Sequence, residues 1–455
     1  MHVAIVGGGP GGLMTGYLLR RLANRPFQLT MFESTGRVGG KVLTSRFSQM
    51  PLCYEAGAAE LYDYSPIDED PLKELVSELG LSTAPMGGHS VFLSGKRYCT
   101  LEDVAQELGA TVQRDWLDFH ERAWGRMSAR EFYESDNSNL CDPSLKSASG
   151  AGSVRFASER SHLGSQPLQT FLETLIHSDL AAEWEQTSID YGLQNYLMND
   201  PRYMQLYSIA GGNEQLTERL AERTEMAICL RQRVLSVERS VRGRLLLRIE
   251  GVSGVSEREF DVVVFCLPML ALSAVEFRGD GLSEAMTRHR KQYDHPAHYL
   301  RVTLLFRRPF WRSWLMDSWC MLDAWGGCCL YDETARQPGA DCGILGWLFG
   351  GVAAVELSAM TDEQLIEAAI DTLPQDRELA RELLIEGRVH RWIGSVSAMP
   401  GGEGSTRLDL RHQPEPVDHP GLFVVGDYLF DSTLNGVLDS ATCVAGWVAA
   451  GLEHG

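Results

Sequence analysis

The sequence lacks any apolar run near the roughly 18 residues that a membrane-spanning helix needs. The first apolar segment begins at residue 2, which leaves no room for a signal peptide, so we expect a cytoplasmic protein without membrane contacts. The ten cysteines contain no C-x-x-C pair, and the adjacent Cys328 and Cys329 do not have the spacing of a metal site. We therefore expect reduced thiols and no metal.

Basic clusters are also missing. Lys and Arg total 41 against 61 for Asp and Glu, which gives a formal net charge of −20. This balance disfavours nucleic acid and anionic membranes as partners, because both attract basic surfaces. With 455 residues, of which 44% are hydrophobic, the chain can bury a large core and is expected to form two domains.

The clearest positive signal is a glycine-rich turn near the start. The β-prone run His2–Val6 leads into Gly7-Gly8-Gly9-Pro10-Gly11-Gly12, and a segment with helical periodicity continues to Leu22. This strand–turn–helix order is the context in which a G-x-G-x-x-G motif binds a dinucleotide. Gly7 permits the tight turn, Gly9 lets a pyrophosphate approach the backbone, and Gly12 lets helix and strand pack closely.

A second predicted strand, Gln28–Glu33, ends on an acid. Glu33 lies 21 residues after Gly12, near the spacing of about 20 at which a carboxylate holds ribose hydroxyls. The N-terminus of the intervening helix offers free N–H groups and partial positive charge to phosphates. Together these features predict a dinucleotide site with Glu33 on the ribose.

Two further segments add to the signal from the glycine turn and Glu33. Arg37-Val38-Gly39-Gly40 follows the second strand, and an apolar run near the other end of the chain leads into Gly426-Asp427 and then a helix. With the glycine turn and Glu33, these segments resemble the flavin-containing amine oxidase family and its wider relatives, the phytoene-desaturase-like and protoporphyrinogen-oxidase-like flavoproteins. The resemblance implies FAD as the cofactor.

The resemblance also implies a role for each matching position along FAD. Arg37 approaches the diphosphate, and Gly39 and Gly40 give close backbone approach, although Lys41 stands where the family usually has a further arginine. The other implied contacts are Gly57 and Ala58 along the flavin ring, Val234 at the adenine, Trp392 at the isoalloxazine, Asp427 at the ribityl chain, and the backbone of Leu434, Asn435 and Gly436.

The implied fold class is α/β, with a discontinuous Rossmann-like FAD-binding domain and a mixed α+β substrate domain. We place the FAD-binding domain at residues 1–70, 205–271 and 387–455, and the substrate domain at 71–204 and 272–386. Apolar spacing predicts helices over Pro71–Leu79, Asp115–Met127, Pro167–Leu193, Met360–Leu373 and Asp376–Glu386. Residues 137–166 are rich in Ser, Gly and Ala and are expected to form a flexible segment.

Substrate and catalytic residues are harder to identify. Arg301 stands where many amine oxidases have a lysine beside flavin N5; it either pairs with a substrate carboxylate or forms a structural salt bridge. Ser397 and Thr433 stand where monoamine oxidases have cage tyrosines, so an aromatic cage is not expected. The candidate catalytic residues are Arg301 and Trp392, and the candidate substrate contacts are Tyr62, Arg301, Tyr331 and Trp347. Tyr62 could equally be a core residue, and for Tyr331 and Trp347, each taken alone, composition favours the hydrophobic core.

The leading functional hypothesis is oxidation of the C–N bond of an amine or amino acid by hydride transfer to flavin N5. Molecular oxygen would then reoxidise the flavin and give hydrogen peroxide. Since the neutral amine is the hydride donor, activity should rise with pH. The alternative is a desaturase or dehydrogenase acting on a C–C bond of a small metabolite, and a third class is a non-catalytic flavoprotein. A homodimer is left open.

Overall fold

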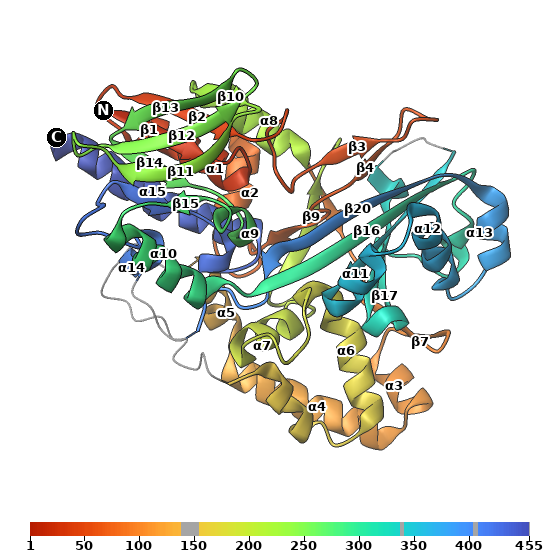
Figure 1. Cartoon of the computed structure of the whole chain (residues 1–455). Helices are drawn as coiled ribbons and strands as arrows, with labels where there is room; N and C mark the ends of the chain where they lie inside the picture. Colours follow the sequence, from red (N-terminus) through yellow and green to blue (C-terminus); the bar gives the residue numbers. More distant parts are fainter. Residues whose placement is uncertain (138–153, 337–340, 404–407, 455) are drawn as a thin grey trace.

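The computed structural model describes residues 1–137, 154–336, 341–403 and 408–454. Two large sheets organise these residues, one close to both chain termini and one on the far side of the molecule (Figure 1). Two long strands, β16 (Pro296–Phe306) and β20 (Leu384–Ser397), extend from the first region into the second. The fold is therefore the expected α/β arrangement with a second, mixed part.

The sheet near the termini is entirely parallel, in the order β10-β2-β1-β14-β21. Its strands come from three distant parts of the sequence, which makes this domain discontinuous, as expected. They are β1 (His2–Val6), β2 (Gln28–Glu33), β10 (Ala227–Leu230), β14 (Val262–Phe265) and β21 (Leu422–Val424).

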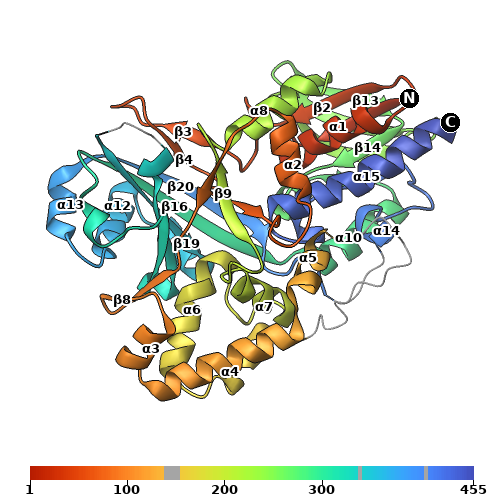
Figure 2. The same ribbon diagram turned by 180° about the vertical axis from the view of Figure 1, so that it is seen from behind.

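Both faces of the parallel sheet are buried. Val3 and Ile5 of β1 pack in a cluster with helices α1 (Pro10–Leu22) and α15 (Leu434–His454), whereas Ala4 and Val6 pack in a cluster on the opposite face. Such nearly continuous apolar strands are typical of parallel sheets covered on both sides. Figure 2 shows α1 and α15 side by side over one face, with α8 (Glu214–Arg223) next to α1.

A mixed sheet, antiparallel except for the parallel pair of β11 and β15, covers the opposite face of the parallel sheet. Its order is β13-β12-β11-β15, and its side chains Leu245 and Leu247 share a core with Phe32 and Phe265. The helices α9 (Met269–Leu272), α10 (Asp280–Tyr293) and α14 (Leu408–His412) lie at the border of this region. The strands are β11 (Arg233–Arg239), β12 (Leu245–Gly251), β13 (Gly254–Phe260) and β15 (Glu276–Phe277).

The second large sheet has seven strands in the order β20-β16-β19-β18-β17-β7-β8. One face packs against α11 (Gly351–Ser358), α12 (Asp362–Asp371) and α13 (Arg377–Leu383), and the other face packs against α6 (Gln166–Leu180). Its remaining strands are β7 (Ser90–Leu93), β8 (Lys96–Tyr98), β17 (Trp319–Leu322), β18 (Cys328–Asp332) and β19 (Gly343–Gly350).

Helices and two small sheets complete the structure. Besides α6, the helices are α2 (Pro71–Glu78), α3 (Leu101–Glu107), α4 (Ala110–Arg126), α5 (Ala129–Asn137) and α7 (Ile189–Leu197). The small sheets are β3 (Thr44–Arg46) with β4 (Cys53–Glu55), and β9 (Gln205–Ile209) between β5 (Leu61–Asp63) and β6 (Thr83–Met86). No helix in the described ranges is long and apolar enough to cross a membrane.

The predicted helices are present with altered bounds. The segment Pro167–Leu193 divides into α6 and α7, and the segment expected as a helix to Glu386 ends at Leu383 because β20 begins at Leu384. Part of the expected flexible segment, residues 138–153, lies outside the described residues, whereas Phe156–His162 forms a 3-10 helix. The domain bounds themselves remain a prediction.

Candidate active site

The glycine turn after β1 depends on two of its glycines for packing. Gly7 has φ +111°, and a Cβ on it would lie 2.4 Å from the carbonyl oxygen of Cys266. A Cβ on Gly12 would lie 2.1 Å from the carbonyl oxygen of Gly7. Because real Cβ atoms do not approach oxygen so closely, larger residues here would push α1 off the sheet.

Gly9 differs because the protein itself leaves space above it. A Cβ on Gly9 would meet only the Cα of Gly40, at an ordinary 3.8 Å, among the atoms of the described residues within 4 Å. Packing within the chain therefore does not explain this glycine, but a ligand that must approach the backbone does. Glu33 lies beside the turn, since its Oε2 accepts the N–H of Gly8 at 2.8 Å. These residues fit the pyrophosphate and ribose of FAD.

The second glycine loop folds back onto the first. The N–H of Gly39 donates to the carbonyl of Gly8 at 2.8 Å, and both Gly39 (φ +105°) and Gly40 (φ +54°) have left-handed backbones. Arg37 forms an ion pair with Glu214 at 3.3 Å and donates to the Val38 carbonyl at 2.8 Å. The structure thus brings Arg37 to the expected loop, and its contact with the diphosphate stays a prediction.

Lys41 links the second glycine loop to the segment before α15. Its Nζ lies 3.2 Å from Oδ2 of the buried Asp427, nearly 400 residues later in the chain. Its carbonyl oxygen accepts the N–H of Ala58 at 3.1 Å and would lie 1.9 Å from a Cβ on Gly57. A glycine at position 57 is therefore required by this crossing, whatever lies on its other side.

Trp392 is anchored to the same segment, because its indole Nε1 donates to the carbonyl of Ala56 at 2.7 Å. At the start of α15, Thr433 Oγ1 accepts the N–H of Gly436 at 3.1 Å, so the Thr433 side chain caps the helix and occupies that N–H. The side chain of Asn435 donates to Asp70 at 3.4 Å. The remaining expected cofactor contacts, Leu434 at the start of α15 and the buried Val234 on β11, stay predictions.

A buried ion pair lies on one face of the seven-stranded sheet, among mostly apolar neighbours. Arg301 on β16 and Glu333 after β18 form an ion pair in which each side chain is only 1% exposed. The guanidinium also lies 5.0 Å from the ring centre of Tyr331. The salt bridge that the sequence left open is therefore present, and Arg301 is not available to a substrate carboxylate in this structure.

Glu333 also binds the segment that precedes Gly57 and Ala58, the two residues expected along the flavin ring. Its Oε2 accepts the backbone N–H of Glu55 at 2.9 Å. The Glu55 carboxyl accepts the N–H of Asn213 at 2.9 Å and lies 3.2 Å from the guanidinium of Arg336. Burial raises the pKa of Glu55 to about 7, although the charge of Arg336 opposes this shift. The polar network thus fixes the chain just before Gly57 and Ala58.

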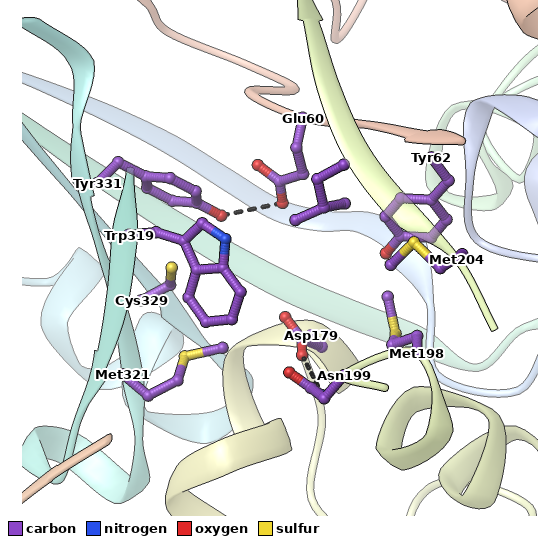
Figure 3. A pocket seen from close by; sticks show the side chains of 11 residues that line it. Glu60, Tyr62, Asp179, Met198, Asn199, Met204, Trp319, Met321, Cys329 and Tyr331 are labelled. Carbon is purple, nitrogen blue, oxygen red and sulfur yellow. Dashed lines mark hydrogen bonds between the residues drawn. The ribbon is translucent and has the colours of Figure 1, made fainter. Parts of the chain in front are cut away.

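A cavity of about 30 Å³ lies next to this network, between the sheet and α6 (Figure 3). Glu60 and Asp179 contribute carboxyl groups on opposite sides of it in this view, and Tyr331 donates its hydroxyl to Glu60 at 2.9 Å. None of the described residues lining the cavity is Lys, Arg or His. The other lining residues are Tyr62, Met198, Asn199, Met204, Leu206, Trp319, Met321 and Cys329.

Both carboxyl groups are protonated more easily than usual. Burial raises the pKa of Glu60, and the charge of Arg301 partly opposes the shift. Burial, together with the nearby Glu60 charge, raises the pKa of Asp179 to about 8. A cation in the cavity would favour the ionised form of either group.

Two expected substrate residues, Tyr62 and Tyr331, line this cavity, whereas Trp347 does not. The cross-strand partner of Tyr331 on β19 is Gly346, so Trp347 points to the opposite face of the sheet. There it is fully buried in the core against the helices, and its Nε1 donates to Thr372 at 2.8 Å. The expectation that Trp347 contacts substrate is corrected accordingly.

Three residues of the cavity, Glu60, Asp179 and Trp319, were not predicted from the sequence. The sequence held a signal for Asp179, because this acid lies three and four residues after the apolar Ile176 and Leu175 and therefore on the apolar face of α6. Glu60 had a weaker signal in the sequence, because it is an acid that directly follows the small residues Gly57, Ala58 and Ala59. No group of three or more His, Cys, Asp or Glu side chains in the described ranges could hold a metal ion.

Comparison with known proteins places this site in a family. The model of the flavin-containing amine oxidoreductases matches residues 10–448. Putrescine oxidase bound to putrescine is similar, with 18% identity, a TM-score of 0.69 and complete coverage of both chains. Cyclohexylamine oxidase from Brevibacterium oxydans IH-35A has 17% identity and a TM-score of 0.70, over 100% of this chain and 98% of that chain.

A protoporphyrinogen oxidase candidate from Exiguobacterium sp. 255-15 is also similar, with 18% identity and a TM-score of 0.66 over 99% of each chain. No curated protein sequence matches the chain significantly. At such identities the solved structures establish the fold, while the family model covers nearly the whole sequence. The chain therefore belongs to the flavin-containing amine oxidoreductase family and is an FAD-dependent oxidoreductase.

Proposed function

We propose that this oxidoreductase oxidises the C–N bond of an amine and that molecular oxygen accepts the electrons, giving hydrogen peroxide. Bound FAD supplies the hydride acceptor for such a reaction. The observation that carries the proposal is the acidic cavity, in which Glu60 and Asp179 face a space with no cationic side chain among its described lining residues. An ammonium group is the complementary ligand for two such carboxyls.

The two other substrate classes fit this cavity less well. A hydrocarbon-like substrate for C–C desaturation would leave the buried Oε2 of Glu60 without a hydrogen-bond partner, which is costly. The carboxylate of an amino acid would be repelled by Glu60 and Asp179, and Arg301 is already paired with Glu333. Two similar structures, named as putrescine oxidase and cyclohexylamine oxidase, agree with an amine substrate.

Each residue around the cavity has a definable task in this proposal. Glu60 accepts an N–H from the substrate nitrogen, while the Tyr331 hydroxyl holds the other carboxyl oxygen in place. Trp319 and Met321 present apolar surface that limits water around the reacting carbon. The Arg301–Glu333 pair supports the Tyr331 ring from behind.

Anaerobic reduction of the FAD-loaded protein tests the proposal. Primary amines should bleach the flavin absorbance, and readmission of air should restore the colour and release peroxide. Unsaturated or hydroaromatic compounds that bleach it when amines do not would establish the C–C alternative. A colour that no compound changes would indicate a non-catalytic flavoprotein.

The substitution Glu60→Gln tests whether the amine binds in this cavity. Glu60→Gln should lower kcat/KM for amines by about 10- to 100-fold, because a charged hydrogen bond contributes about 1.5–3 kcal/mol. The matched control is Glu69→Gln, which removes an exposed acid from the same stretch of chain and should change kcat/KM little. Equal effects of the two substitutions would contradict a role for Glu60 in amine binding.

A further inference from the structure

His177, in the last turn of α6, has both ring nitrogens next to hydrogen-bond acceptors. Its Nδ1 lies 3.0 Å from the carbonyl oxygen of Gly327, and its Nε2 lies 3.1 Å from Oε1 of Glu183. A neutral imidazole can donate from one nitrogen only, whereas the imidazolium ion donates from both. Because a carbonyl and an ionised carboxyl only accept, both hydrogen bonds exist together only when His177 is an imidazolium ion.

The backbone closes tightly around this ring. A Cβ on Gly351 would lie 2.6 Å from Oε1 of Glu183 and 2.9 Å from Nε2 of His177. A Cβ on Gly327 would lie 2.8 Å from the carbonyl oxygen of Thr174 and 3.0 Å from Cβ of His177. Since only 5% of His177 is exposed, the ring depends on these protein partners more than on solvent.

The charges around the ring also favour the imidazolium ion. Burial disfavours the charged ring, but the hydrogen bond and the charge of Glu183 outweigh it and raise the pKa of His177 above the usual 6.5. The same hydrogen bond lowers the pKa of Glu183, which also accepts the N–H of Val352 at 3.0 Å. Glu173 adds negative charge near His177, and Arg160, which pairs with Glu173 at 3.1 Å, favours the ionised form of Glu183.

The hydrogen bond from His177 to Gly327 connects two walls of the cavity. Asp179, which lines the cavity, lies two residues after His177 in α6. Gly327 directly precedes β18, which carries Cys329 and Tyr331 on the sheet side of the cavity (Figure 3). His177 itself is not among the described residues that line the cavity, so it acts on the cavity through the spacing of these elements.

We propose that His177 is a positioning residue that clamps α6 to the start of β18 as an imidazolium ion and thereby keeps the cavity in its binding shape. Loss of the proton leaves one ring nitrogen facing an acceptor, so one of the two hydrogen bonds is lost and the clamp weakens. The inference takes the cavity as the substrate site from the proposed function. The clamp and the proposed chemistry respond to pH in opposite directions, because hydride transfer needs the neutral amine that high pH favours.

Thermal unfolding of the FAD-loaded protein, followed by circular dichroism, tests the clamp without substrate. The stabilisation by His177 is complete below pH 6.5 and is lost as pH rises through the raised folded-state pKa, whereas that by Glu183 is complete above pH 4.5 and is lost as pH falls. His177→Gln should therefore lower Tm by about 2 °C or more between these limits, and the difference should shrink at higher pH. His162→Gln, at an exposed histidine, is the control and should show no pH-dependent difference. A Tm difference for His177→Gln that does not depend on pH would overturn the clamp.

Glu183→Gln tests whether the imidazolium ion is the effective form. It keeps an acceptor for His177 but removes the negative charge, so the pH at which the clamp weakens should fall by about one unit. The measurement is the apparent Kd of n-pentylamine, taken from the concentration dependence of anaerobic flavin reduction, with variant and wild type compared at each pH to cancel the ionisation of the amine. Glu185→Gln removes a charge from the same segment and should leave the midpoint in place.

The two substitutions should act differently on n-pentylamine binding. His177→Gln should raise its apparent Kd about threefold or more at pH 6, and the ratio to wild type should approach one above the midpoint, with little change in the reduction rate at saturation. An unchanged midpoint in Glu183→Gln would overturn the clamp, and it decides the matter if His177→Gln does not fold. If no amine reduces the flavin, the proposed function is refuted, and the pH dependence of Tm still decides whether the clamp exists.

Discussion

At the scale of single residues, Arg301 and Glu333 form an ion pair that is almost completely buried. Both side chains are 1% exposed, so each charge depends on the other for compensation. Replacing both with apolar residues is often tolerated in proteins, whereas removing one partner strands the remaining charge. A glycine at position 346 leaves the required space, because a Cβ there would lie 2.7 Å from Oε1 of Glu333.

Glu333→Leu should therefore destabilise the protein by about 3–5 kcal/mol, because Arg301 is left buried without its counter-ion. Thermal unfolding of the apoprotein, followed by circular dichroism, measures the loss as a lower Tm. The exposed pair of Arg21 and Glu78 provides the control: Glu78→Leu should cost less than about 1 kcal/mol. A Tm for Glu333→Leu as high as that of the control would mean that the buried pair contributes little.

Residues in local motifs were predictable from the sequence, and residues assembled by tertiary packing were not. Gly7, Gly12 and Glu33 owe their positions to one strand–turn–helix unit, so spacing along the chain was sufficient to find them. Glu60 and Asp179 meet only because α6 packs on the sheet that carries Tyr331. Their sequence separation hides that proximity, and no motif marks it.

At the level of elements, the loop that contains Lys41 crosses the segment that contains Gly57 and Ala58 and fixes its backbone. The segment with Gly57 and Ala58 lies directly against the carbonyl of Lys41, and Trp392 from β20 holds the preceding Ala56. Lys41 in turn reaches Asp427 before α15. Three distant parts of the chain thus meet at one point, which explains why packing alone requires a glycine at position 57.

Gly57→Ala tests this crossing. The added Cβ would lie 1.9 Å from the Lys41 carbonyl oxygen, so the two loops must separate, at a cost of about 1–3 kcal/mol. The variant should retain less FAD after gel filtration, measured as the ratio of flavin to protein absorbance. Gly446→Ala in α15 meets no atom within 4 Å and is the control, with unchanged retention. Full FAD retention by Gly57→Ala would show that the crossing is adaptable.

Strand faces explain the one corrected substrate residue. Tyr331 on β18 and Trp347 on β19 were both candidate substrate contacts, and Tyr331 lines the cavity. Trp347 pairs across the strands with Leu330 and Val302, both core residues, and therefore shares their face. Alternation along one strand was visible in the sequence, but the register between strands, which decides the matter, was not.

At the level of the whole molecule, the negative charge and the acidic cavity act on the same kind of ligand. The formal net charge of −20 creates a potential that attracts cations toward the protein surface. The carboxyls of Glu60 and Asp179 then provide the local partner once the cation enters the cavity. The long-range and short-range contributions differ in one measurable respect: salt screens exposed charges strongly and buried charges weakly.

Ionic strength should therefore change kcat/KM for amines more than the rate of flavin reduction at saturating amine. Raising NaCl from about 10 to 300 mM shortens the Debye length from about 30 Å to below 10 Å, so kcat/KM for amines should fall severalfold. The rate of flavin reduction at saturating amine, measured by stopped flow, should stay constant and is the internal control. A diamine should show the steeper dependence, because it carries twice the charge through the same potential. A kcat/KM that is constant or rises with salt would mean that the net charge does not assist capture.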